Sequence, residues 1–188
     1  MSFYPIFKLG LYNAWIFMSI FILQMLVMAF VNRKIWKKSF VPLQAKRNRF
    51  EKHAGEFANL FWFIALIYSI FLPLKLNTIW FYLGLIIYIG GLIILIRATY
   101  DFIITNPNRI IKTGAYRISR HPMYLATFLI TLSISIASMS WLFFILIVLM
   151  MFFFYKEACI EERLCLEIFS NEYKEYLNHV QRWIGRKK

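Results

Sequence analysis

The sequence has few acidic residues and few cysteines. Only 9 of its 188 residues are Asp or Glu, against 22 Lys or Arg, so the net charge is +13. Such a charge can indicate nucleic-acid binding, but the chain has no basic helix or aromatic-basic strand motif, so no nucleic-acid partner is expected. Cys159 and Cys165 are six residues apart, about 9 Å along a helix, which is too far for a disulfide. Four ligands at zinc spacing are also absent, so no structural metal is expected.

The chain has long apolar runs instead. Hydrophobic residues make up 61% of it, well above the roughly half-apolar composition of soluble domains. Runs over residues 11–30, 57–72 and 79–96 each approach the length that crosses about 30 Å of hydrocarbon. A further stretch, 123–155, is too long for one span, and Ser138-Met139-Ser140 within it predicts a tight turn. We therefore expect an all-α integral membrane protein with five transmembrane helices, of which the last two, 123–138 and 141–155, form a hairpin.

The cations are concentrated on one side of this arrangement. Between the first and second spans lie Arg33, Lys34, Lys37, Lys38, Lys46, Arg47, Arg49 and Lys52, and between the third and fourth lie Arg97, Arg109, Lys112, Arg117 and Arg120. The opposite side holds only Lys8 and Lys75. The positive-inside rule then predicts an outside N-terminus and a cytosolic C-terminus, in a multi-pass protein of the cell membrane. The first run is too long for the apolar region of a signal peptide and lacks an A-x-A cleavage site, so we expect it to be retained.

The fifth span has a helical pattern from Trp141 to Phe169, which is longer than the bilayer requires. Its last turns are therefore expected in the cytosol. After a break at Ser170-Asn171, an amphipathic pattern that continues to Ile184 predicts a cytosolic C-terminal helix. No internal repeat or linker divides the chain, so residues 1–188 are expected to form a single domain.

The end of this long helix carries a group of glutamates. Neighbouring residues on a helix point about 100° apart, so Glu161 and Glu162 are not expected to reach one spot, whereas Glu157 and Glu161 share a face. We expect one carboxylate of that pair to face inward. The alternative is a solvated helix end with a salt bridge to Arg163 or Arg120.

The start of the fourth span is a second polar feature. Pro122 suits the first turn of a helix, and Ser119 or His121 can cap its exposed amides. The helix dipole, Arg120 and His121 together predict a site for an anion. Alternatively, Arg117 and Arg120 anchor the helix to lipid headgroups.

Residues 105–116 connect the third and fourth spans. Thr105-Asn106-Pro107-Asn108 breaks the chain, and Gly114 predicts a turn before Tyr116, so this stretch can form the rim of a pocket or serve only as a connector. Within the third span, Gly84, Gly90 and Gly91 predict close helix packing.

Two segments carry a resemblance to a known family. They are G-A-Y-R-I-S-R-H-P-M-Y (114–124) and, after a hydrophobic hairpin, E-E-R-L-C-L-E-I-F-S-N-E-Y-K-E-Y (161–176). In this order they resemble the integral-membrane methyltransferases that include isoprenylcysteine carboxyl methyltransferases and phospholipid N-methyltransferases. The likeness covers roughly residues 105–184 and is weak before them.

The resemblance implies a specific cofactor, S-adenosyl-L-methionine, bound on the cytosolic side between the start of the fourth span and the cytosolic extension of the fifth. The residues that it implies for the cofactor are Asn108, Arg109, Ile110, Ile111, Tyr116, His121, Pro122, Met123, Tyr124, Glu161 and Glu162, and Arg120 and Glu161 are implied as catalytic. The chemistry of the cofactor agrees with these residues. Its carboxylate can bind at a helix N-terminus, its sulfonium can bind next to a carboxylate or an aromatic ring, and its adenine can pack on an apolar wall.

One position departs from the family pattern. In the carboxyl methyltransferases an arginine one turn before the glutamates holds the acceptor carboxylate, but here that position is Glu157. A glutamate repels a carboxylate and attracts an amine, so Glu157 is a candidate substrate residue. It favours an amine-bearing or neutral lipid-like or small hydrophobic acceptor over prenylcysteine. Lys156 would change this interpretation if the helix register were shifted by one.

Three other functions remain open from the sequence. The first is an isoprenylcysteine-type carboxyl O-methyltransferase. The second is a membrane sterol reductase, which has a similar R-H-P-x-Y ending and uses NADPH, although such chains are usually longer and have more spans. The third is a non-enzymatic membrane binding module on the same scaffold. The sequence leaves the oligomeric state open.

Overall fold

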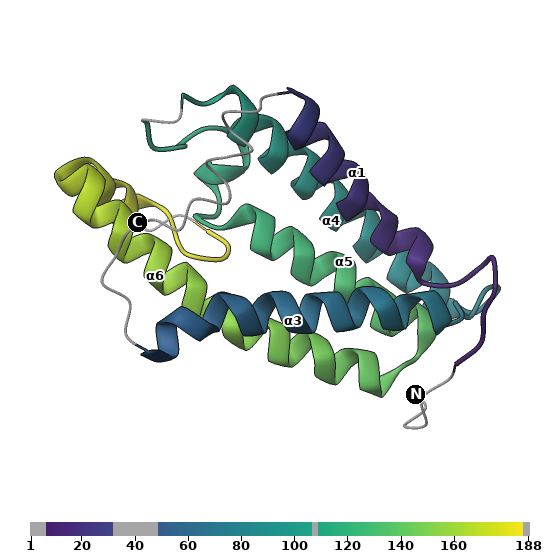
Figure 1. Ribbon diagram of the computed structural model, residues 1–188. Coiled ribbons are helices and arrows are strands. Elements are labelled where there is room, and N and C mark those ends of the chain that lie inside the picture. The colour runs from purple at the N-terminus through teal and green to yellow at the C-terminus, as the bar shows by residue number, and fades with distance from the viewer. Residues whose placement is uncertain (1–6, 32–48, 107–108, 186–188) are drawn as a thin grey trace.

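The computed structural model describes residues 7–31, 49–106 and 109–185, and these ranges are helical with no strand (Figure 1). The helices are α1 (Trp15–Val31), α3 (Arg49–Phe71), α4 (Ile79–Ile104), the short 3₁₀ helix η1 (Gly114–Arg117), α5 (Pro122–Ser138) and α6 (Trp141–His179). Helices α3, α4 and α6 are long and apolar enough to cross a membrane, and α1 and α5 are shorter apolar helices. The all-helical architecture is thus confirmed for the described residues, with three helices suited to cross a membrane, while the count of five spans stays a prediction.

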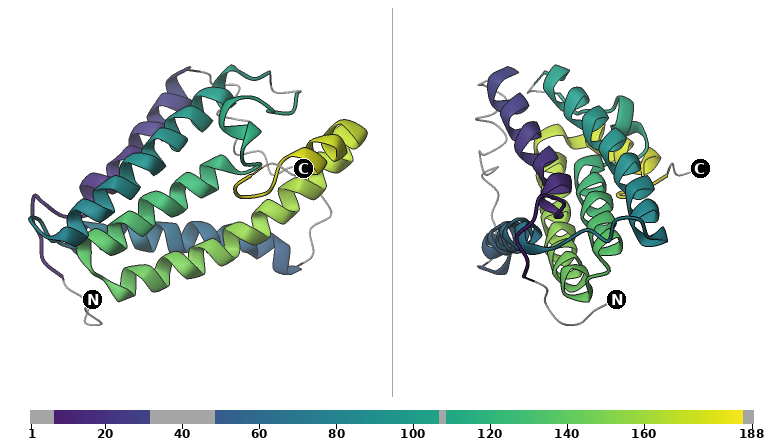
Figure 2. Two further views of the ribbon diagram at one scale, coloured as in Figure 1. Left: turned by 180° about the vertical axis from the view of Figure 1, so that it is seen from behind. Right: turned by 90° about the vertical axis from the view of Figure 1, so that its right-hand side faces the viewer.

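The helices pack mainly as two pairs, α4 along α5 and α3 along α6, with α1 against α3, α4 and α5 (Figure 2). Two glycines on one face of α4 allow close approach to α5. A Cβ atom at Gly84 would lie 2.7 Å from the carbonyl oxygen of Ser133, and one at Gly91 would lie 2.9 Å from Cγ1 of Ile130. A Cβ atom at Gly90 would meet nothing within 4 Å, so the prediction of close packing is correct for Gly84 and Gly91 and wrong for Gly90.

A tight turn joins α5 to α6 at the predicted place. Met139 adopts a left-handed conformation with φ 55°, and the Ser140 hydroxyl accepts a hydrogen bond from the amide of Phe143 at the start of α6. Behind this turn, Ile134 and Phe143 are buried in the core that α5 and α6 share with the other helices. The hairpin therefore directs the far end of α6 toward the start of α5.

The helix ends extend beyond the apolar runs. α3 begins at Arg49 rather than Phe57, and α4 continues past Ile96 to Ile104. Apolar runs mark only the stretch suited to lipid, whereas helical hydrogen bonding continues into polar sequence wherever tertiary contacts support it. For α3 such a contact is the two-bond ion pair between Glu51 and Arg163 of α6, at 2.9 and 3.0 Å.

The C-terminal region differs most from expectation. The predicted break is present at Ser170, which has non-helical torsion angles (φ 46°, ψ −118°). The helix after it ends at His179, not at Ile184, so the predicted amphipathic helix is too long. Residues 180–185 turn back instead, and their backbone pairs with the residues before α5: the Arg120 amide donates to the Gln181 carbonyl (3.1 Å), and the Gly185 amide to the Ile118 carbonyl (2.9 Å). These bonds outweigh the helical pattern and place the C-terminal segment beside the start of α5 (Figure 1).

Candidate functional site

Three segments meet at the candidate site: the start of α5, the glutamate-bearing turns of α6, and residues 180–185. Pro122 is at the start of α5, where its fixed φ suits a helix and its missing N–H leaves no unsatisfied donor. The hairpin and the returning C-terminal segment then bring together side chains that are 20 to 41 residues apart in the sequence.

His121 lies at the centre of the cluster. Its Nε2 is 3.1 Å from Oε1 of Glu162, and its Nδ1 is 3.2 Å from Oε2 of Glu161. The prediction that Glu161 and Glu162 point to different places is therefore wrong. The two side chains leave α6 in different directions, but the imidazole fits between them and carries a nitrogen on each edge.

Glu162 is the most heavily paired carboxylate of the cluster. Arg182 binds it through two hydrogen bonds, from Nε to Oε1 at 2.9 Å and from Nη2 to Oε2 at 2.8 Å. Nη2 of Arg120 is 3.2 Å from Oε1, and the Glu162 side chain is only 9% exposed. Two arginines and a histidine thus neutralise a buried carboxylate, as the low dielectric of such a site requires. The predicted alternative of a solvated helix end is wrong for Glu162, which is buried, although the salt bridge to Arg120 that it included is present.

Glu161 is more open and belongs to an aromatic wall. Its side chain is 39% exposed, and its Oε1 accepts a 2.6 Å hydrogen bond from the Tyr124 hydroxyl. The Tyr124 ring stacks on His121 at 5.6 Å and on Phe154 at 4.8 Å, nearly parallel to both. The cluster therefore places a partly exposed carboxylate at the edge of a stack of aromatic rings, and a carboxylate there attracts cations.

The carboxylates hold the cluster in a charged form. Burial alone lowers the pKa of His121, but hydrogen bonds and charges from Glu161 and Glu162 outweigh burial, so the pKa of His121 is raised. The hydrogen bonds to Glu162 likewise raise the pKa of Arg182. His121 is thus stabilised as a cation between two anions.

Capping at the start of α5 differs from the prediction. His121 occupies the N-cap position, but its side chain makes no capping hydrogen bond to the described residues. The Ser119 hydroxyl also does not cap the helix: it accepts from the His121 amide (3.1 Å) and donates to the Arg182 carbonyl (3.1 Å). Ser119 therefore fixes the C-terminal segment to the start of α5, because the backbone of Arg182 lies within its reach.

The connector before α5 forms a rim at the same end of the molecule. Gly114 makes the predicted turn, with φ 54°, and the Tyr116 carbonyl accepts a 2.6 Å hydrogen bond from the Tyr176 hydroxyl. Burial, and then the charge of Glu161, raise the pKa of the Tyr116 phenol. Ile110 packs on the C-terminal part of α6 with Tyr173 and Tyr176, while Tyr116 lies within range of the charge of Glu161.

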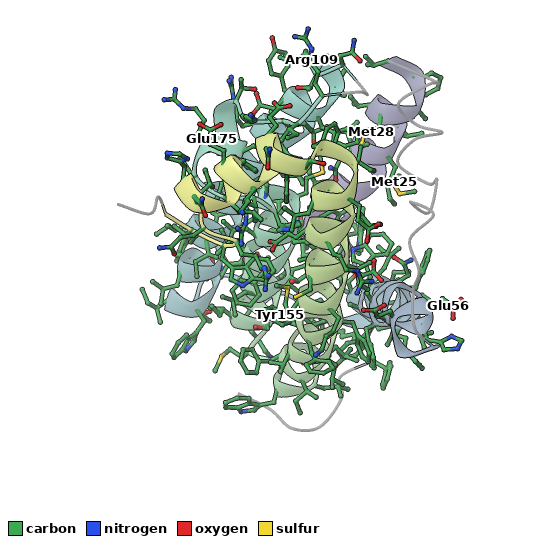
Figure 3. The ribbon with its side chains drawn as sticks, turned by 90° about the vertical axis from the view of Figure 1, so that its left-hand side faces the viewer. Met25, Met28, Glu56, Arg109, Tyr155 and Glu175 are labelled. Atoms are coloured by element: carbon green, nitrogen blue, oxygen red, sulfur yellow. The ribbon has the colours of Figure 1, made fainter. Side chains whose placement is uncertain are left out.

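The other predicted residues have varied surroundings. Arg109 is exposed and lies far from Tyr155 of α6 (Figure 3). Glu157 is buried and faces α3, where a Cβ atom at Gly55 would lie 3.0 Å from its Oε1. Ile111 and Met123 are half-buried, and Asn108 lies outside the described residues.

The structure adds two residues that the sequence did not indicate. Arg182 falls within the C-terminal helix that the sequence predicts, but in the structure its guanidinium binds Glu162 and lies 4.9 Å from the centre of the Tyr155 ring. Trp183 lies 6.3 Å from the His121 ring. No spacing rule links these residues to the glutamates, because their contacts depend on the chain reversing after His179.

The arrangement fits a zwitterionic ligand. Nε of Arg120 is buried and has no hydrogen-bond partner among the described residues. A buried guanidinium N–H without a partner is costly, and a ligand carboxylate would satisfy it. Glu161 and the ring of Tyr124 provide a place for a positive group nearby. Arg120, His121, Tyr124 and Glu161 are therefore the residues that could hold S-adenosyl-L-methionine.

A comparison with known families identifies the chain. The model of the phospholipid methyltransferase family matches residues 78–172, about half of the chain. The match spans α4, η1, α5 and most of α6, and so includes Arg120, His121, Tyr124, Glu161 and Glu162 but not Arg182. No curated protein matches the chain. The chain belongs to the phospholipid methyltransferase family.

Proposed function

We propose that the protein transfers a methyl group from S-adenosyl-L-methionine to a lipid-like or small hydrophobic acceptor at the cytosolic face of the membrane. The family match and the apolar helices support methyl transfer in a bilayer. The observation that carries the cofactor assignment is the buried Nε of Arg120, which lacks a partner among the described residues, near a half-exposed Glu161. The proposal includes five spans, an outside N-terminus and location in the cell membrane.

The chain's own residues would bind and orient the reactants. Arg120 and the first amides of α5 would hold the carboxylate of the cofactor, which supplies an electrophilic methyl group on a sulfonium. Glu161 and the Tyr124 ring would stabilise the positive sulfonium end. Displacement in line with the departing sulfur then depends on alignment, which contributes up to about 7 to 11 kcal/mol in well-held geometries. Residues 180–185, which cover the start of α5, would help to exclude water.

The acceptor that we propose carries an amine or is neutral. Glu157 is buried one helical turn before Glu161, in a region where a carboxylate acceptor would be repelled. The site lies at the start of α5, where this apolar helix meets polar sequence. An apolar acceptor could therefore reach it sideways from the bilayer.

Binding of labelled S-adenosyl-L-methionine to the purified protein tests the proposal. We expect saturable binding in the wild type and weakened binding in His121→Ala and Glu161→Ala. Glu167→Ala is the matched control, since Glu167 is an exposed glutamate on the same helix and outside the cluster. No saturable binding in the wild type, or equal binding in all variants, would contradict the proposal.

Two further measurements separate the other functions. NADPH rather than S-adenosyl-L-methionine would raise the melting temperature of a sterol-reductase-like enzyme. Mass spectrometry of lipid extracts incubated with the protein and cofactor should reveal a species heavier by one methylene, and its identity would give the acceptor. A carboxyl ester as product would favour the isoprenylcysteine-type reaction, and cofactor binding without any methylated product would favour a binding module.

A further inference from the structure

Asp101 is a fully buried carboxylate on α4, outside the cluster described above. Its side chain is 0% exposed. Oδ2 accepts a 2.9 Å hydrogen bond from the amide of Ala115, and Oδ1 lies 3.3 Å from Nη2 of Arg97, at ion-pair distance although not aligned as a hydrogen bond. A buried acid on an apolar helix is costly, so its contacts indicate what it does.

The turn at Gly114 is shaped around this carboxylate. Gly114 has φ 54°, which glycine adopts without strain, and a Cβ atom there would overlap Oδ2 of Asp101. The turn therefore needs glycine for two independent reasons, its backbone conformation and the space that the carboxylate occupies. Asp101 and Gly114 together bring the connector against the end of α4.

The attached segment leads directly into the candidate site. Ala115, which donates to Asp101, precedes Tyr116, whose carbonyl accepts the hydrogen bond from Tyr176 of α6. Asp101 thus holds η1 to α4 on one side, while Tyr176 holds it to α6 on the other. Arg120 and His121 follow η1 within a few residues, so the position of η1 also sets where α5 begins.

We propose that Asp101 is a positioning residue for the cofactor site: by binding the Ala115 amide it fixes η1, so that Tyr116 and the start of α5 face the glutamates of α6. This inference rests on the proposed function, because it assigns Asp101 a part in cofactor binding. Asp101 itself does not contact the cluster; it acts through the backbone of η1.

The test compares cofactor affinity and melting temperature in the purified full-length protein. Asp101→Ala removes a hydrogen bond to a charged group, and we expect the Kd for labelled S-adenosyl-L-methionine to rise on the order of tenfold. Asp101→Asn keeps an oxygen that can accept from Ala115, so it should recover most of the affinity. Asp101→Leu has a similar side-chain volume but no acceptor, so recovery in Asp101→Asn without recovery in Asp101→Leu would show that the hydrogen bond matters, and equal recovery in both would overturn the inference in favour of packing alone.

Thr99→Val is the matched control. Thr99 is a buried polar residue on the same helix, but its hydroxyl accepts a hydrogen bond from Gln24 of α1 and not from η1. Its replacement should leave the Kd unchanged even if the melting temperature falls. A wild-type Kd in Asp101→Ala, or an equal rise in Thr99→Val, would overturn the inference.

Gly114→Ala provides a second route if Asp101→Ala fails to fold. It leaves the carboxylate in the protein but displaces it from the turn, so the Kd should rise here too, and an unchanged Kd would contradict the inference. Failure of the wild type to bind the cofactor would refute the proposed function and, with it, this role of Asp101. If the wild type binds the cofactor and Asp101→Ala binds it equally well, the positioning role alone is refuted.

Discussion

Replacing Arg182 with alanine tests whether the C-terminal segment is an integral part of the site. Arg182→Ala removes two hydrogen bonds to Glu162, at 2.9 and 2.8 Å, and leaves a carboxylate that is only 9% exposed. The Arg182 side chain is itself 23% exposed, so the pair is largely shielded from water. The variant therefore removes the main partner of a buried charge.

The expected loss of stability follows from the partners that remain. Removing one member of a fully buried pair costs about 3 to 5 kcal/mol. Glu162 keeps Arg120 at 3.2 Å and His121 at 3.1 Å, so its charge stays partly compensated. We therefore expect about 2 kcal/mol, a typical cost for losing hydrogen bonds to a charged group. For a chain of this size that corresponds to a fall of about 4 to 8 °C in melting temperature.

The chain offers a matched control for this measurement. Arg163 also makes two hydrogen bonds to a glutamate, Glu51, at 2.9 and 3.0 Å, but that pair is more open to water, with side chains 43% and 19% exposed against 23% and 9% for Arg182 and Glu162. Arg163→Ala should therefore lower the melting temperature less than Arg182→Ala, because the contribution of an ion pair falls as its exposure to water rises. The assay is thermal unfolding of both variants in the same detergent or nanodisc. Equal losses in the two variants, or none in Arg182→Ala, would refute the burial argument.

Three further predictions concern other parts of the molecule. Because the pKa of His121 is raised in the folded protein, its contribution to stability is complete below about pH 6.5, its usual pKa, and is lost as the pH rises through the raised value. The melting temperature of the wild type should fall over that range more steeply than that of His121→Gln, and parallel curves would contradict this. Gly84→Val should destabilise the protein by roughly 1 to 3 kcal/mol, because the added Cβ atom would meet the α5 backbone. Gly90→Val, where a Cβ atom meets nothing within 4 Å, should be nearly neutral in the same unfolding assay. Equal effects would argue against close packing at Gly84. Ser170→Gly should stabilise the protein by about 1 kcal/mol, because a φ of 46° strains a serine backbone but not a glycine backbone. A lower melting temperature would show that the contacts of the serine side chain outweigh this strain.

Much of the fold could be predicted from the apolar pattern. Local sequence indicated three changes of chain direction, because serine and glycine favour turns over helix. These are the turn at Ser138-Met139-Ser140, the turn at Gly114 and the break at Ser170. Helix ends were predicted less well, as at Arg49, because tertiary ion pairs extend a helix beyond its apolar stretch.

The candidate site could be predicted only in part. The residues around Pro122 and the glutamates of α6 were indicated by their positions at helix ends and by a family resemblance. The contacts of His121 with both Glu161 and Glu162 were not predicted. The angle of about 100° between neighbouring residues of a helix gives the directions of their Cα–Cβ bonds, but the carboxylates of long side chains can still reach the same group. The contribution of Arg182 was also missed, since a helical pattern was assumed to continue past His179.

The sequence by itself determined the apolar helices, the tight turn between α5 and α6 and the chemical types available at the site, because these depend on residues close together in the chain. Only the tertiary structure decided which charges are paired. The hairpin brings α6 back to the start of α5, and residues 180–185 form backbone hydrogen bonds there instead of a further helical turn. Arg182 reaches Glu162, and Asp101 reaches the Ala115 amide, only because distant segments are brought within hydrogen-bonding distance. Such contacts depend on the path of the whole chain, which local periodicity does not encode.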